Sequence, residues 1–254
     1  MKSNTIVLVL ALTLSGMFSC TEDSVIDNNE LPPNSNEPEI GLLNDIDGNS
    51  YRTVKIGNQY WMKENFKSSK YNDGTPITNI QSGAAWAKSL EGAYCSYQNE
   101  SHYSDTFGLL YNYYAIESGK LCPDGWRIPT ADDWKTLLNY IDSVLQVPNE
   151  CDALRSYSGW INEHQDIDAN GLDLLGFKAL PTGYLALVSD DSVDFYGKQS
   201  WTMFWSNTNS GNKDSTHIYV LDLSPYNPSK IDESGYSISA LPKNYGLSIR
   251  LIKE

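Results

Sequence analysis

One segment of the sequence carries the residue types and the spacing that could bind a calcium ion. Asp166, Asp168 and Asn170 occupy alternate positions ahead of Gly171, as in the first half of a calcium-binding loop. The twelfth position of such a loop needs a glutamate that binds the ion through both oxygens, and here it is Phe177. Asx turns account for the same residues without a metal, so these three residues are weak calcium candidates. We expect no bound cofactor.

The chain has no motif for zinc binding or for the common kinds of catalytic chemistry. His102, His164 and His217 are isolated, without a second histidine or a cysteine at metal-ligand spacing, so a zinc site is not expected. The sequence has no Gly-x-Ser-x-Gly, no Cys–His pairing and no phosphate loop. Carboxylates are plentiful, and a pair of them could still form a glycosidase site. Two function classes remain: a non-catalytic binding module for glycan or protein, and an unrecognised hydrolase that acts on extracellular polysaccharide.

Residues 1–20 have the pattern of a lipoprotein signal peptide. Lys2 gives a positive start, and residues 5–18 contain an uncharged apolar run that is too short to span a bilayer. Small residues then lead to Cys20, although the bulky Phe18 departs from the pattern. We predict that cleavage leaves Cys20 as the acylated N-terminus. Several acyl chains, at about 0.8 kcal/mol per buried CH₂, then anchor the protein stably. The alternative is an ordinary signal peptide that leaves Cys20 as a thiol.

The stretch that follows is acidic and polar. Residues 21–50 contain eight acidic side chains and no basic one, and prolines lie among asparagine and serine. This composition predicts a disordered tether over residues 21–40, followed by one domain over residues 41–254. Glu22-Asp23 resembles the signal that sends lipoproteins of Bacteroidota to the outer face of the outer membrane. We therefore expect an outer-membrane, lipid-anchored protein at the cell surface, although a solvated acidic linker explains these two residues equally well.

Charge and composition limit the kinds of partner that the protein can bind. The 254-residue chain has 32 acidic and 18 basic residues and a net charge of −14, so it lacks the basic field that binds nucleic acid. Its aromatic residues are mostly Tyr (17) and Trp (7), whose rings can stack on sugars or anchor a protein partner. The candidate ligand-binding rings lie in turn-rich stretches: Tyr94, Tyr97, Tyr103, Tyr196 and Trp201. The alternative for each ring is a place in the core.

The elements that must position these residues form an α+β pattern. Turn signals predict a three-stranded meander over residues 45–62. A helix begins at Thr130, which with Asp133 resembles a capping box, and an apolar stripe continues it to Leu145. A second helix is expected over residues 109–117, and strands are expected over 184–188, 201–205, 216–223, 235–240 and 246–252. This order indicates a mainly antiparallel sheet with two helices in the central part.

Several segments occur in an order that is typical of one family. They include Asp45-Ile-Asp-Gly-Asn49, Val54-Lys-Ile-Gly-Asn58, Trp61-Met-Lys-Glu-Asn65, Cys122-Pro-Asp-Gly-Trp-Arg-Ile-Pro-Thr130, Gly176-Phe-Lys-Ala-Leu-Pro-Thr-Gly-Tyr184 and Gly246-Leu-Ser-Ile-Arg250. Together they resemble the Fibrobacter succinogenes major paralogous domain over nearly all of residues 42–254. Members of that family are secreted or lipid-anchored proteins with no established activity.

That family is similar in turn to C-type-lectin-like folds, which include the formylglycine-generating enzymes. The resemblance implies a C-type-lectin-like fold here, but a fold that carries unrelated functions does not settle this one. Formylglycine generation needs a reactive cysteine pair in the C-terminal region, and no cysteine follows Cys151. The sugar-binding motifs of the C-type lectins are also absent from the sequence.

The cysteines depart from the family pattern at one position. The family commonly has a cysteine in its last strand, and here Leu251 takes that place, so a partner that the family offers to Cys122 is missing. With Cys20 acylated, the resemblance then implies a disulfide between Cys95 and Cys122. Such a bridge closes a loop of about 27 residues and adds about 3 kcal/mol to stability. Cys151 is expected to stay reduced and partly buried.

Metabolic labelling with a palmitate analogue tests the lipid anchor. We expect the wild-type chain to be labelled and Cys20→Ala to be unlabelled, because only Cys20 follows the signal-peptide pattern. Cys151→Ala, which removes a different thiol, should be labelled like the wild type. A Cys20→Ala protein that still takes up the label and stays in the membrane fraction would contradict the prediction.

Overall fold

A three-stranded antiparallel meander opens the fold, as the turn signals predict. The computed structural model describes residues 41–147, 149–162, 167–211, 216–224 and 238–254, which belong to one compact unit. The meander consists of β1 (Leu42–Asn44), β2 (Ser50–Ile56) and β3 (Gln59–Met62). Asp45 stabilises its first turn, because Asp45 Oδ1 accepts hydrogen bonds from the N–H groups of Asp47 and Asn49 at 3.0 and 2.9 Å.

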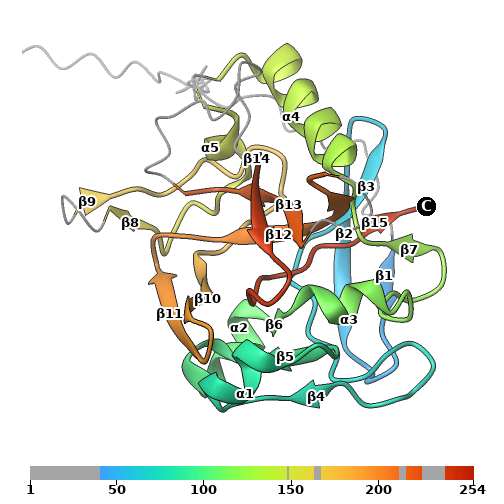
Figure 1. The fold of residues 1–254 in the computed structure, drawn as a ribbon. Helices are drawn as coiled ribbons and strands as arrows, with labels where there is room; N and C mark the ends of the chain where they lie inside the picture. The colour runs from blue at the N-terminus through green and yellow to red at the C-terminus, as the bar shows by residue number, and fades with distance from the viewer. Residues whose placement is uncertain (1–40, 148, 163–166, 212–215, 225–237) are drawn as a thin grey trace, which may run out of the picture. The chain divides into compact units, whose positions relative to one another are not determined.

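The last strand of the chain joins this sheet. β15 (Ile252–Lys253) pairs antiparallel with β3 and with β7 (Trp126–Arg127), so the strands of the described part follow the order β1-β2-β3-β15-β7. Figure 1 shows the red C-terminal strand beside the blue strands from the beginning of the domain. The two ends of the domain are therefore held in one sheet.

The C-terminal third forms further antiparallel sheets, which confirms a mainly antiparallel α+β architecture. β10 (Thr182–Ser189) and β11 (Ser192–Lys198) make a hairpin, and β12 (Met203–Asn209), β13 (His217–Asp222) and β14 (Ile238–Pro242) make a second sheet. Of the expected strand 235–240, residues 235–237 lie outside the described residues, and of 246–252 only the end is β15. The sequence does not predict β11, because Asp194 and Gly197 interrupt its apolar pattern.

The other described strands are only two or three residues long. They are β4 (Thr78–Asn79), β5 (Ala93–Cys95), β6 (Leu110–Tyr111), β8 (Ile161–Asn162) and β9 (Ile167–Asp168). β4 pairs parallel with β5, whereas β5–β6 and β8–β9 pair antiparallel. Such short strands carry no periodic pattern long enough to be predicted.

The described residues hold five α-helices rather than the two that were expected. They are α1 (Gly83–Lys88), α2 (His102–Phe107), α3 (Tyr113–Glu117), α4 (Ala131–Leu145) and α5 (Glu150–Leu154), with a 3₁₀ helix at Tyr97–Asn99. α4 begins as predicted, since Thr130 Oγ1 accepts from Asp133 N at 3.1 Å and Asp133 Oδ2 accepts from Thr130 N at 2.7 Å. The second expected helix is wrong in its first half, because Leu110 and Tyr111 form β6 and the Asn112 side chain caps α3. Within the part of the chain that the structure describes, no helix combines the length and apolar character needed to cross a bilayer.

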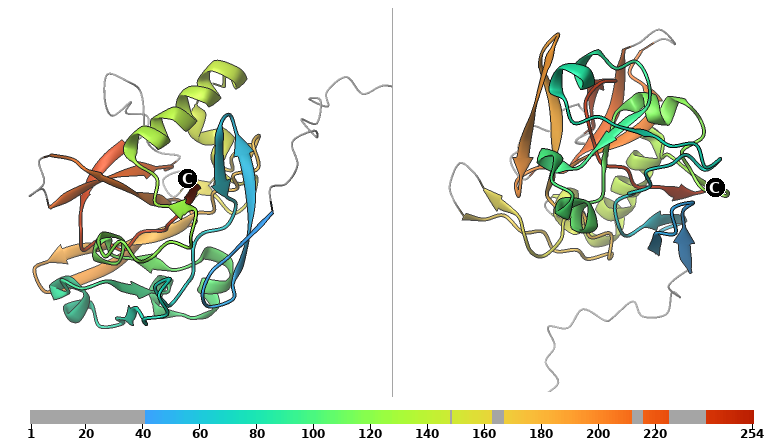
Figure 2. Two further views of the ribbon diagram at one scale, coloured as in Figure 1. Left: turned by 90° about the vertical axis from the view of Figure 1, so that its right-hand side faces the viewer. Right: turned by 90° about the horizontal axis from the view of Figure 1, so that it is seen from below.

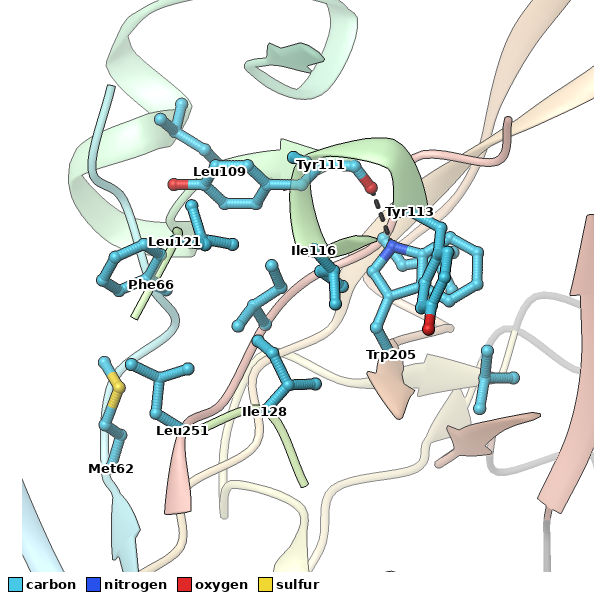
Figure 3. Packing of buried hydrophobic residues seen from close by; sticks show 14 of the residues in the cluster. Met62, Phe66, Leu109, Tyr111, Tyr113, Ile116, Leu121, Ile128, Trp205 and Leu251 are labelled. Carbon is cyan, nitrogen blue, oxygen red and sulfur yellow. Dashed lines mark hydrogen bonds between the residues drawn. The ribbon is translucent and has the colours of Figure 1, made fainter. Parts of the chain in front are cut away.

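Aromatic side chains anchor the helices to the sheets. Trp61 of β3 stacks on Trp134 of α4 with ring centroids 4.5 Å apart, which fixes the long helix against the meander. Figure 3 shows a neighbouring cluster, where Phe66, Tyr111 and Trp205 lie among aliphatic side chains. Trp205 Nε1 donates a 2.8 Å hydrogen bond to the backbone oxygen of Tyr111, so this buried polar group is satisfied.

A fully buried cation, Arg250, joins distant segments of the chain. Its guanidinium donates hydrogen bonds to Asn65 Oδ1 (2.6 Å) and to the backbone oxygens of Met62 (2.9 Å), Phe177 (2.7 Å) and Lys178 (3.0 Å). It also lies 4.7 Å from the ring centroid of Phe177 and 5.5 Å from that of Phe204. Burial lowers the pKa of Arg250 to about 9, and the charges of Glu64 and Asp173 oppose that shift. The side chain remains a cation at neutral pH.

The predicted Cys95–Cys122 disulfide is not formed in the structure, where Cys95, Cys122 and Cys151 are all free thiols. Cys95 is buried in β5 within a cluster that contains Trp86. Cys122 packs against a different cluster, and Cys151 is buried in a third. Two cysteines that belong to separate clusters do not meet, and this separation cannot be deduced from their positions in the sequence.

Candidate functional site

The β10–β11 hairpin brings most of the predicted aromatic residues to one part of the molecule. Its strands pair with Tyr184 opposite Tyr196 and with Leu185 opposite Phe195. Successive side chains of a strand point to opposite faces, so the tyrosine pair faces away from the Leu185–Phe195 pair. In Figures 1 and 2 the hairpin stands at the edge of the fold, and its strand β11 packs beside α1.

The tyrosine face continues into three successive rings, Tyr196, Tyr184 and Trp201, which we call the aromatic ladder. The ring centroids of Tyr196 and Tyr184 are 5.9 Å apart at 30°, and Trp201 meets Tyr184 edge-on at 6.0 Å and 71°. Tyr196 is 42 % exposed, whereas Tyr184 and Trp201 are half-buried. Gly197 permits this packing, because a Cβ at its position would lie 2.4 Å from Trp201 Cβ. The ladder presents one accessible ring on an ordered support.

A buried carboxylate holds the inner end of the ladder. Trp201 Nε1 and the N–H group of Ser224 each donate a 2.8 Å hydrogen bond to Asp222 Oδ1. Burial raises the pKa of Asp222 to about 6, and the two hydrogen bonds limit the rise. Asp222 therefore fixes the orientation of the Trp201 indole and changes its charge near pH 6.

The opposite face of the hairpin packs against a second group of rings, Tyr97, Tyr103, Phe107 and Phe195, which we call the ring cluster. Tyr97 lies 5.2 Å from Phe195 and meets Tyr103 edge-on at 5.9 Å, while Tyr103 stacks on Phe107 at 5.8 Å. Tyr97 is only 4 % exposed, which corrects its assignment as a ligand-binding ring, because Phe195 and Tyr103 enclose it. Lys198, at the end of β11, places its Nζ 4.1 Å from the centroid of the Tyr103 ring.

The weak calcium candidates do not form a site that the structure describes. Asp166, His164 and the side chain of Asp168 lie outside the described residues. Asn170 Oδ1 accepts a 2.9 Å hydrogen bond from the N–H group of Trp160. Among the described residues, no three His, Cys, Asp or Glu side chains are grouped so that they could hold a metal ion.

Sequence reasoning found only part of this site. Tyr184, Lys198 and Asp222 were missed, and Tyr94, which was a candidate, is half-buried in β5 with its ring 6.3 Å from that of Tyr111. One signal could have found Tyr184: it and Tyr196 lie at nearly equal distances from the acidic turn at 189–191, as facing residues of a hairpin do. Lys198 and Asp222 carry no comparable local signal.

The family model for the Fibrobacter succinogenes major domain matches residues 54–253. The chain belongs to this family. No curated protein and no solved structure matches it. Three of the motifs on which the resemblance to this family rests, at residues 61–65, 176–184 and 246–250, meet at the Arg250 guanidinium. Tyr196 and Lys198 of β11 lie outside these motifs, so the motifs describe the framework more than the hairpin's exposed side chains.

Replacing Asp222 with asparagine should change how stability depends on pH. The folded-state pKa of about 6 exceeds the ordinary 3.8, so between these values the folded protein binds a proton that the unfolded chain has lost. Wild-type stability therefore falls as the pH rises through this window. A shift of this size corresponds to about 3 kcal/mol. Compared with the wild type, Asp222→Asn should gain about 2 kcal/mol of unfolding free energy between pH 4 and pH 7, because part of the change lies below pH 4.

Urea unfolding of both proteins at the two pH values measures this change. Taking the difference between variant and wild type cancels the contributions of all other titrating groups. A difference that stays constant, or that moves in favour of the wild type at pH 7, would show that burial does not raise the pKa of Asp222.

Proposed function

We propose that the protein is a non-catalytic binding module that recognises a glycan with its aromatic ladder. The observation that carries the proposal is the exposed ring of Tyr196, which Tyr184 and Trp201 support from behind. Such a ring offers its apolar face to the C–H groups of a sugar and keeps its hydroxyl in water. Because the supporting rings are already ordered, little side-chain entropy is lost on binding.

The distribution of exposed apolar side chains favours a glycan over a protein partner. A stable protein interface buries about 800 Å² on each partner, which requires a continuous patch. In the described part of the chain, the large exposed apolar residues come mostly from different elements: Leu42, Ile46, Leu90, Val144, Tyr157, Leu172, Leu174, Val188 and Tyr196. A single supported ring is enough for stacking on a sugar.

The proposal includes display at the cell surface through acylated Cys20 in the outer membrane. The signal-peptide pattern and the acidic composition of residues 21–50 support it. If the predicted tether over residues 21–40 is disordered, its root-mean-square span is about 25 Å, enough to clear lipid headgroups. The C-type-lectin-like fold that the family resemblance implies belongs to the same proposal.

Recognition without catalysis agrees with the chemistry of the exposed motif loop. Cys122 is the half-buried thiol of the Cys-Pro-Asp-Gly-Trp segment, and burial raises its pKa to about 12. A protonated thiol is a poor nucleophile at neutral pH. Arg127 of the same loop is held by Asp133, with Nη1–Oδ2 and Nη2–Oδ1 distances of 2.6 and 2.9 Å. These groups serve to hold the loop in place.

A glycan-array screen of a soluble form that begins at Thr21 tests the function. For each glycan that binds, Tyr196→Ala should weaken binding at least tenfold, or about 1.4 kcal/mol, because the stacking ring is removed. The melting temperature should stay near that of the wild type, since Tyr196 is partly exposed. Tyr60→Ala, a half-buried tyrosine of β3 on another sheet, is the matched control and should bind normally.

Two outcomes would contradict the proposal. Binding that survives Tyr196→Ala unchanged would remove the ladder from recognition. Turnover of any bound glycan by the wild-type protein would replace the binding module with the hydrolase alternative.

A further inference from the structure

A cavity of about 300 Å³ lies where the end of β11 meets α2 and the loop after α5. Its wall includes apolar side chains and groups that can donate hydrogen bonds: Thr106, Phe107, Ser158, Pro181, Lys198 and Gln199. The volume is at the lower end of the range for ligand pockets, which suits one ring-sized group. No acidic side chain belongs to the part of this wall that the structure describes.

Lys198 is held at the cavity by an aromatic side chain rather than by a carboxylate. Its Nζ lies 4.1 Å from the Tyr103 ring centroid and is hydrogen-bonded to the Tyr103 hydroxyl. Among the described residues, Lys198 forms no ion pair with a carboxylate, although acidic side chains outnumber basic ones by 32 to 18. Tyr103 thus positions a positive charge at the cavity without neutralising it.

We propose that this cavity binds the carboxylate-bearing ring of an acidic glycan, a uronic acid residue, with Lys198 as its counter-ion. The hydroxyl groups of Thr106 and Ser158 and the amide of Gln199 supply hydrogen bonds to the sugar, and Phe107 supplies an apolar surface. This inference rests on the proposed glycan-binding function and names the substrate class.

The position of the cavity connects it to the aromatic ladder. Lys198 follows Tyr196 by two residues in β11, so their Cα atoms are at most about 7 Å apart. The two features lie on opposite faces of the hairpin, since Lys198 Nζ contacts Tyr103 of the ring cluster, so an oligosaccharide that reaches both must pass around the end of β11. The net charge of −14 repels polyanions in general, so the attraction must come from this local cation.

Calorimetric titration with tri-galacturonic acid and with its methyl ester tests the inference. The two probes differ in charge and little else. The wild-type protein should bind the acid at least tenfold more tightly than the ester. Lys198→Gln should lose this preference while binding the ester as the wild type does, and Lys198→Arg should retain the preference. Lys135→Gln, which removes a lysine of α4, should leave both affinities unchanged.

The outcomes separate this inference from the proposed function. Equal binding of acid and ester by the wild type, binding of neither probe, or a preference that survives Lys198→Gln would overturn the uronic acid site. If the ester binds and Tyr196→Ala abolishes that binding, the function stands even when the acid preference is absent. A competing arm titrates N-acetyltyrosine and its amide. Binding of the free carboxylate form alone, with no binding of tri-galacturonic acid, would assign the cavity to peptide carboxylates and overturn the glycan assignment.

Discussion

The buried guanidinium of Arg250 is the interaction on which the rest of the fold depends. It collects its acceptors from the end of β3, from Asn65 and from residues 177–178, which are far apart in the chain. A buried cation is tolerated only when its donors are satisfied, so these segments must converge for the domain to fold. The rings of Phe177 and Phe204 complete the enclosure. Three of the segments on which the family resemblance rests are therefore joined by one polar centre within an aromatic core.

The contacts of Arg250 also explain how the β10–β11 hairpin is held in place. The segment that gives Arg250 two carbonyl acceptors leads directly into β10, the strand that carries Tyr184. Tyr184 and the Trp201–Asp222 pair then support Tyr196 from the framework side. Strand β11 lies on the outside of this arrangement, so its side chains can vary without disturbing the buried cation. A rigid framework that supports an exposed ring is what the proposed binding module requires.

The sequence predicted those features whose causes are local. The Thr130–Asp133 capping box and the apolar stripe behind it define α4 within fifteen residues, and the structure reproduces them. Local patterns fail for Tyr97. It lies in a turn-rich stretch and was expected to be a ligand-binding ring, yet Phe195, from a hairpin far along the chain, encloses it. Tyr184 was missed for the same reason, since its partner across the hairpin is set by the register of strand pairing. Lys198 and Asp222 likewise take their places in the site from contacts that no local pattern encodes.

The unfolding free energy of Arg250→Met at neutral pH, compared with Arg52→Met, tests the central role of the buried cation most directly. Arg52 is half-exposed and pairs with Glu64, and such a surface pair contributes at most about 1 kcal/mol. Methionine at position 250 leaves one amide oxygen and three carbonyl oxygens without their donor, so a loss of at least about 3 kcal/mol, or failure to fold, is predicted. An Arg250→Met protein as stable as the wild type would contradict the account.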